Sequence, residues 1–163
     1  MTTASKRAPL VCALAFAAAL IAGTIAPSSA FLDKTRFVAH LGVAYFAFHH
    51  FVWKPYKAGE FDNGAPHRIS TIVKGGVALL FAVHEVKVAD KIAKTSNDPL
   101  LQKLDGALGG LSTQFATIGQ KLKGGNFDPK DIEGLNGATT GVSSAAAADG
   151  ATIKDVPVAI PGQ

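Results

Sequence analysis

Residues 37–53 read FVAHLGVAYFAFHHFVW and carry no Asp, Glu, Lys or Arg. They include the only Trp of the chain and three of its five His. On a helix with 3.6 residues per turn, one face would carry Phe37, Leu41, Ala44, Phe48 and Phe51. The opposite side, with Gly42, Phe46 and Trp53, is also apolar. Such a helix has to be covered by other elements, a membrane or a partner, so we expect the rest of the chain to be organised around it.

Residues 1–30 predict a secretory signal peptide. A basic start at Lys6 and Arg7 precedes an apolar run at residues 10–26, and small residues at 28–30 precede a cleavage point. The alternative is an uncleaved N-terminal anchor, because the run is close to the ~17 residues that a membrane span needs. A cleaved signal would place the mature protein outside the cytoplasm, either secreted or associated with the cell envelope.

The remaining residues, 31–163, have the length of a single domain. The only cysteine, Cys12, lies in the apolar run, so the exported part would contain no disulfide. The chain has 16 Lys and Arg against 12 Asp and Glu, and loss of Lys6 and Arg7 would leave an excess of two basic residues. So small an excess does not favour nucleic acid as a partner.

Residues 31–94 predict a first helical hairpin that is rich in aromatic and His side chains. Its first helix would be capped by Asp33 or Thr35 and would end before Pro55, because the residue before a proline disfavours the helical conformation. A loop at residues 55–67 would lead to a second helix at 68–94. One apolar stripe of that second helix carries Ile69, Val73, Val77, Leu80 and His84, and Ile72, Gly76 and Val83 lie beside it.

Residues 99–154 predict a second hairpin. Asp98 is a good N-cap for a helix at 99–123, and a further helix is expected from residue 130 to about residue 154. The 99–123 helix carries an apolar seam with alternating spacings of three and four residues: Leu101, Leu104, Leu108, Leu111, Phe115, Ile118 and Leu122. This seam would pair with the last helix or between copies of the chain. The tail at 155–163, which contains two prolines, reads from its composition as extended or disordered.

The fold class predicted from these segments is all-α, with two helical hairpins within residues 31–154 that form a four-helix bundle. The alternative is a split molecule, in which the second hairpin projects and the first docks elsewhere. The adjacent Gly75 and Gly76 would each weaken the second helix by about 1 kcal/mol unless another helix approaches closely.

Two internal segments and the C-terminal one resemble small secreted proteins of unknown role from high-GC Gram-positive bacteria. The likeness is carried by AHLGVAYFAFHHFVWKPY at residues 39–56, KGGVALLFAVHEVKVADKIA at residues 74–93 and IKDVPVAIPG at residues 153–162. The resemblance implies an exported setting without catalytic residues. It also implies that the C-terminal segment is a fixed feature of the protein, where composition alone reads as a loose tail.

The five histidines fall between His40 and His84 and suggest a metal or haem site. The candidate ligands are His40, His50 and His84, because His84 could approach either of the others across an antiparallel hairpin. The angular spacing on the first helix does not build a site on that helix alone, and the chain has no HExxH or CxxCH motif. The alternative is that these side chains lie at helix surfaces or are satisfied in the core by a backbone or hydroxyl partner, and we expect no cofactor.

Four side chains at the end of the first helix form an aromatic and basic rim: Trp53, Lys54, Tyr56 and Lys57. Such a rim predicts contact with a partner or with the interface of a membrane. The alternative is an aromatic core helix with a polar end. We do not expect the first hairpin to span a membrane. Its first helix would be about 24 Å long against a hydrocarbon core of ~30 Å, and Lys74 interrupts the second helix.

The hydroxyl residues Ser112, Thr113, Ser143 and Ser144 lie outside any GxSxG or SxxK motif, and no phosphate-binding glycine loop is present. The sequence therefore predicts an exported, non-enzymatic helical protein. Its expected role is binding or structural, at the cell envelope or outside the cell. The partner would be an unknown protein or envelope component, and self-association through the 99–123 seam is a further expectation.

Overall fold

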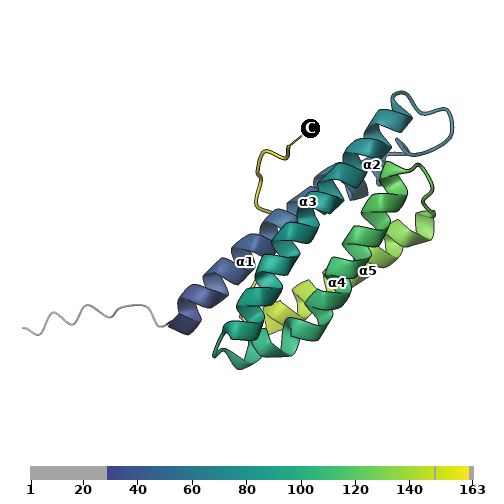
Figure 1. Ribbon diagram of the computed structural model, residues 1–163. Helices are drawn as coiled ribbons and strands as arrows, with labels where there is room; N and C mark the ends of the chain where they lie inside the picture. The colour runs from purple at the N-terminus through teal and green to yellow at the C-terminus, as the bar shows by residue number, and fades with distance from the viewer. Residues whose placement is uncertain (1–28, 149, 162–163) are drawn as a thin grey trace, which may run out of the picture.

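A computed structural model describes residues 29–148 and 150–161 of the chain. The regular secondary structure of these residues is entirely helical, without a strand (Figure 1). The elements are α1 (Ser29–Phe48), the π-helical turn η1 (His49–Trp53), α2 (Lys54–Lys57), α3 (Arg68–Thr95), α4 (Pro99–Lys123) and α5 (Pro129–Ala148). The predicted signal peptide lies outside the described residues except for its last two positions, and it stays a prediction.

The first helix begins earlier than predicted. Asp33 and Thr35 lie within α1, where the Thr35 hydroxyl donates a hydrogen bond to the Phe31 carbonyl at 3.0 Å. Neither residue therefore caps the helix, and the predicted start was wrong. Lys34 reaches Asp98 at 3.4 Å, so an ion pair ties this first part of α1 to the turn between α3 and α4.

The first helix also continues past Pro55, where the sequence predicted its end. Pro55 lies inside α2, which follows η1 without a break. A proline ring in an α-helix clashes with the carbonyl four residues earlier, here that of Phe51. The preceding turn is π-helical, and the Lys54 N–H bonds to the His49 carbonyl five residues back. We attribute the continuation to this wider turn, which makes room for the ring.

The most extensive helix pair is α3 with α4, followed by α1 with α3 (Figure 1). A Cβ atom on Gly76 of α3 would lie 2.7 Å from the Lys123 nitrogen and 2.8 Å from the Gly119 carbonyl oxygen of α4. A Cβ atom on Gly119 would in turn lie 3.2 Å from Leu79 and Leu80. The two helices therefore touch backbone to backbone at Gly76. Gly75 faces η1 instead, where an added Cβ atom would lie 2.9 Å from the Phe51 carbonyl oxygen, so each of the paired glycines has its own close approach.

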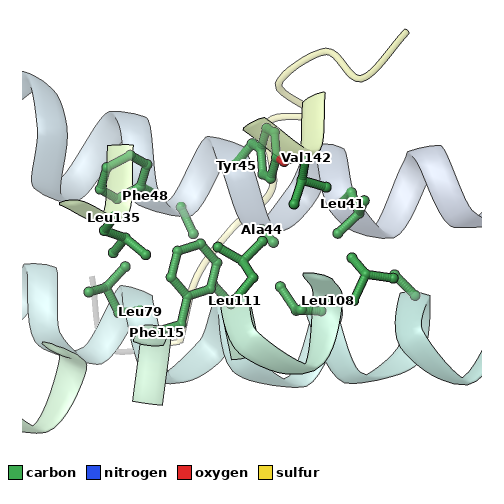
Figure 2. Packing of buried hydrophobic residues seen from close by; sticks show 14 of the residues in the cluster. Leu41, Ala44, Tyr45, Phe48, Leu79, Leu108, Leu111, Phe115, Leu135 and Val142 are labelled. Carbon is green, nitrogen blue, oxygen red and sulfur yellow. The ribbon is translucent and has the colours of Figure 1, made fainter. Parts of the chain in front are cut away.

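The core is shared by all four long helices. The α4 seam is buried along its whole length, as predicted, with Leu101, Leu104, Leu108, Leu111, Phe115, Ile118 and Leu122 all inside. Figure 2 shows Phe48 of α1 above Phe115 of α4, whose ring centroids are 6.1 Å apart, with Leu135 of α5 beside them. The apolar face of α1 is thus covered by the chain itself, and the second hairpin does not project. Pairing between copies through the seam would require the helices to separate, so self-association stays a prediction.

The predicted core stripe of α3 was wrong at Ile69, Val73 and His84, while Val77 and Leu80 are half-buried. Ile69 is 76% exposed, Val73 is 37% exposed, and His84 also faces solvent. The buried face is wider, lies on another side of the helix and is made mostly of small residues: Ile72, Gly75, Gly76, Ala78, Leu79, Ala82, Val86, Ala89, Ile92 and Ala93. Small side chains line this face because α4 approaches too closely for large ones. Among the described helices only α3 is long and apolar enough to cross a membrane by length and composition.

The last helix is shorter than predicted, ending at Ala148 rather than near residue 154. Gly150, at φ 80°, donates its N–H to the Ala147 carbonyl, and the Ala151 N–H bonds to the Ala146 carbonyl. These two bonds form a Schellman motif, which uses a glycine at positive φ to end a helix. The side chain of Ile153, predicted to continue the helical pattern, is instead buried from beyond the helix end.

The C-terminal segment, residues 151–160, is irregular and lies across α1. The Val156 N–H donates to the Gly42 carbonyl at 2.9 Å, and Ala151, Ile153 and Ile160 are buried. A Cβ atom on Gly42 would collide with the Lys154 carbonyl oxygen and would lie 2.7 Å from a methyl group of Val156. The segment is therefore seated on α1 at a position that only glycine permits.

Candidate functional site

A cavity of about 160 Å³ lies where α1, α5 and the C-terminal segment meet. Its lining combines residues that are far apart in sequence: Tyr45, His49, Thr139, Thr140, Ser143, Ser144, Ile153 and Asp155. We call this the His49 cavity. Six of the lining side chains come from helices, which hold them at fixed spacings, and two come from the segment that α1 holds in place.

An imidazole–carboxylate pair forms one wall of the His49 cavity. The Nδ1 atom of His49 lies 2.8 Å from Oδ1 and 3.0 Å from Oδ2 of Asp155, and both side chains are about one-third exposed. Because a carboxylate only accepts hydrogen bonds, Nδ1 must carry the proton that joins them. In the neutral ring Nε2 is then an acceptor, and no described residue donates to it.

Tyr45 forms the buried end of the cavity. Its hydroxyl donates to the Thr139 carbonyl of α5 at 2.8 Å, and its ring meets that of His49 edge to face at 6.0 Å. Burial holds the pKa of Tyr45 far above the ordinary value for a phenol, so this hydroxyl stays a neutral donor. Tyr45 and His49 are four residues apart and therefore share one side of the helix. Figure 2 shows Tyr45 beside Val142 of α5.

The α5 wall of the cavity is made of hydroxyl groups. Thr140, Ser143 and Ser144 are spaced three and four residues apart, which places them on one side of the helix. Thr139 is different, because its hydroxyl donates to the Asn136 carbonyl at 2.9 Å. No hydrogen bond joins the hydroxyls of the other three to another described residue. They are therefore free to bond to a molecule in the cavity.

Histidine, aspartate and serine together raise the question of nucleophilic catalysis. A hydrolase of that kind needs the imidazole hydrogen-bonded to the nucleophile and donors for an oxyanion. In the described part of the chain, His49 bonds to Asp155 and to neither Ser143 nor Ser144. The geometry therefore supports a binding site and does not show the contact on which a hydrolase depends.

The structure does not bring the predicted metal ligands together. His40 pairs with Glu85 of α3, with Nδ1 and Oε2 2.7 Å apart, and His50 stacks on Phe46 with a centroid distance of 5.1 Å. His84 faces solvent. Across residues 29–148 and 150–161 no group of three or more His, Cys, Asp or Glu could hold a metal ion. His40, His50 and His84 therefore gain no support as a shared site.

The predicted rim does gather at one end of the molecule. Trp53 is half-buried, and the centroids of its ring and the Tyr56 ring are 5.9 Å apart. The Lys57 ammonium lies 5.7 Å from the centroid of the Trp53 ring. Tyr56 donates to Glu133 of α5 at 3.1 Å; partial burial and this carboxylate raise its pKa. Lys54 and Lys57 are exposed. The rings of the rim thus pack on the core while its two ammonium groups face outward.

Comparison with protein families, with curated proteins and with solved structures gives no match for this chain.

Of the residues of this cavity, Ser143 and Ser144 were considered from the sequence only as hydroxyls outside a catalytic motif, and the others were not predicted as site residues. Two signals were present: the four-residue spacing of Tyr45 and His49, and the hydroxyl spacing of Thr140 and Ser144. Asp155 could not have been found in this way. Its pairing with His49 spans 106 residues and depends on where the C-terminal segment is seated.

Proposed function

We propose that this chain is an exported, non-enzymatic helical protein whose role is to bind a molecule at the cell envelope or outside the cell. In this proposal the four long helices act as a four-helix bundle, and the His49 cavity is the binding site. The pattern of residues 1–30 supports export, as does the resemblance to small secreted proteins. The observation that carries the binding role is the convergence of three hydroxyls, an imidazole and a carboxylate on one cavity.

The physical case for binding is the number of polar groups that the fold leaves unused at this place. Thr140 and Ser144 are exposed and Ser143 is half-buried, so water satisfies these hydroxyls in the free protein, and a ligand with hydroxyls of its own would replace that water. Rigid elements hold these groups, since α1 and α5 are tied together by the bond from Tyr45 to Thr139. Little ordering would be needed on binding, which favours affinity.

The test is binding of the purified mature chain to isolated cell envelopes, measured by cosedimentation. Ser144→Trp should fill the cavity and lower envelope binding at least tenfold. The matched control is Ala145→Trp, because Ala145 is the exposed neighbour of Ser144 and its side chain would point away from the cavity. The proposal fails if the wild-type chain stays in the supernatant, or if both tryptophan variants bind equally well.

Export has its own test. We expect the protein recovered from the culture medium or the envelope fraction to begin at Phe31, as read by N-terminal sequencing. A chain that retains residue 1 and pellets with membranes would instead support the uncleaved anchor.

A second candidate is binding to a membrane interface. It is favoured by the outward ammonium groups of Lys54 and Lys57, and by Ile69, which is 76% exposed at the start of α3. Flotation with liposomes containing anionic lipid tests it. The wild-type chain should float with the liposomes, and Ile69→Ser should stay in the bottom fraction. If Ser144→Trp also stays in the bottom fraction, the cavity and not the rim binds the liposomes. The metal or haem alternative has no contact in the described residues to favour it.

A further inference from the structure

The geometry of the His49 cavity points to a small polyol, such as a single sugar unit, as its ligand; we infer this class from the donors, acceptors, charge and size of the cavity. The inference rests on the proposed function, because it names the ligand of the same site. Its test is chosen so that the ligand class can fail while the site stands.

The hydrogen-bonding groups of the cavity fit hydroxyls. Thr140, Ser143 and Ser144 can each donate and accept, while Nε2 of His49 and the carboxylate oxygens of Asp155 accept. The free acceptors outnumber the free donors. A ligand hydroxyl is also both donor and acceptor, so several hydroxyls on one small frame would satisfy this set.

The negative charge of the cavity argues against an anionic ligand. Asp155 is the acidic residue of the lining, and no Lys or Arg lines the cavity to offset it. His49 already donates to Asp155, so a phosphate or carboxylate would meet a negative wall. A primary ammonium would satisfy the carboxylate, but its three N–H groups would leave the donor hydrogens of the α5 hydroxyls unused.

The size of the cavity and the apolar part of its lining restrict the class of ligand further. An apolar cavity of about 150 Å³ holds a benzene ring, so about 160 Å³ has room for one ring, and a longer chain would have to extend outside. Ile153 is buried, and the ring of Tyr45 lies next to that of His49. These groups offer an apolar wall to the C–H face of a sugar ring, while the hydroxyls face its edge.

Because Ile153 and Asp155 belong to the C-terminal segment, a bound polyol would also hold this segment on α1. The Val156 N–H, which bonds to the Gly42 carbonyl at 2.9 Å, reports on that seating. Binding stabilises the state that binds, so this amide should exchange with solvent more slowly when the ligand is present.

The experiment is an NMR titration of the mature chain with D-glucose and myo-inositol, following the His49 imidazole signals and the exchange of the Val156 amide. Ethanolamine and inorganic phosphate are titrated in parallel. We expect a polyol to shift the His49 signals and to slow Val156 exchange. Thr140→Val and Ser143→Ala should each raise Kd about three- to tenfold, as the loss of one hydrogen bond does. The control Thr117→Val changes an exposed threonine on α4 and should leave Kd unchanged.

Several results would overturn the inference. If ethanolamine or phosphate shifts the His49 signals and no polyol does, the ligand class is wrong and the site stands. If no probe shifts them while Ser144→Trp still abolishes envelope binding, the class is again wrong and the proposed function stands. If a polyol binds with the same Kd after both hydroxyl substitutions, it binds elsewhere.

Discussion

Replacement of Gly76 by alanine tests the contact that sets the spacing of α3 and α4. The added Cβ would lie 2.7 Å from the Lys123 nitrogen and 2.8 Å from the Gly119 carbonyl oxygen. Ordinary van der Waals contact begins at about 3.5 Å, so the α4 backbone would have to retreat by roughly 0.7–0.8 Å. Both contacts are to backbone atoms, which cannot rotate away. Overpacking of this kind costs about 1–3 kcal/mol, while alanine returns about 1 kcal/mol of helix propensity.

The matched control is Gly110→Ala, on an exposed face of α4 where an added Cβ meets no atom within 4 Å. This variant should gain helix propensity without the clash. Because both variants gain the same propensity, the difference between them reports the clash alone. In urea unfolding, the free energy of unfolding of Gly76→Ala should be about 1–3 kcal/mol lower than that of Gly110→Ala. Its dependence on urea concentration, the m value, should be unchanged. A Gly76→Ala variant as stable as the control would refute the backbone contact between α3 and α4.

Three further predictions concern the buried hydroxyl of Tyr45, the N-cap residue Asp98 and the contact between Gly42 and the C-terminal segment. Tyr45→Phe should destabilise the protein by about 1–2 kcal/mol at neutral pH, because a buried hydrogen bond is lost. Burial raises the pKa of Tyr45, so the wild-type free energy of unfolding should fall as pH rises above about 10; urea titrations at several pH values should show less of this fall in Tyr45→Phe. Asp98→Ala should cost about 0.5–2 kcal/mol through loss of the N-cap of α4 together with the ion pair to Lys34, whereas Asp98→Asn, which keeps a capping side chain, and Asn97→Ala, an exposed neighbour, should cost little in the same assay; equal losses in all three would argue against the cap. Gly42→Ala should displace the C-terminal segment and speed its removal by limited proteolysis, while Gly137→Ala, with open space around its Cβ, should not.

The parts of the fold predicted well are those decided by local signals. The second and third predicted helices match α3 and α4 closely, because Asp98 with Pro99 marks a start and a glycine pair marks an end. The seam of α4 was also found, since a strict alternation of three and four residues leaves only one apolar face. The Asp98 side chain accepts from the Leu100 N–H at 2.9 Å, as its type and position predicted.

The errors share a different cause. On α3 apolar residues lie all round the helix, so periodicity could not choose the buried face, and the contact with α4 chose the one with glycine and alanine. The continuation through Pro55 depended on a π-helical turn, which no pattern of residue types announced. The end of α5 at Ala148 was missed because Ile153 continues the helical spacing. Its side chain reaches the core from the C-terminal segment instead.

The sequence by itself determined that the described chain is helical, and that an apolar helix near its start needs cover, because residue type and spacing act within a few turns. Only the tertiary structure decided what supplies the cover and which polar groups are left to bind a ligand. His49 meets Asp155 because Gly42 lets the C-terminal segment lie against α1. Such a contact depends on backbone distances between segments far apart in the chain, and no local pattern records those distances.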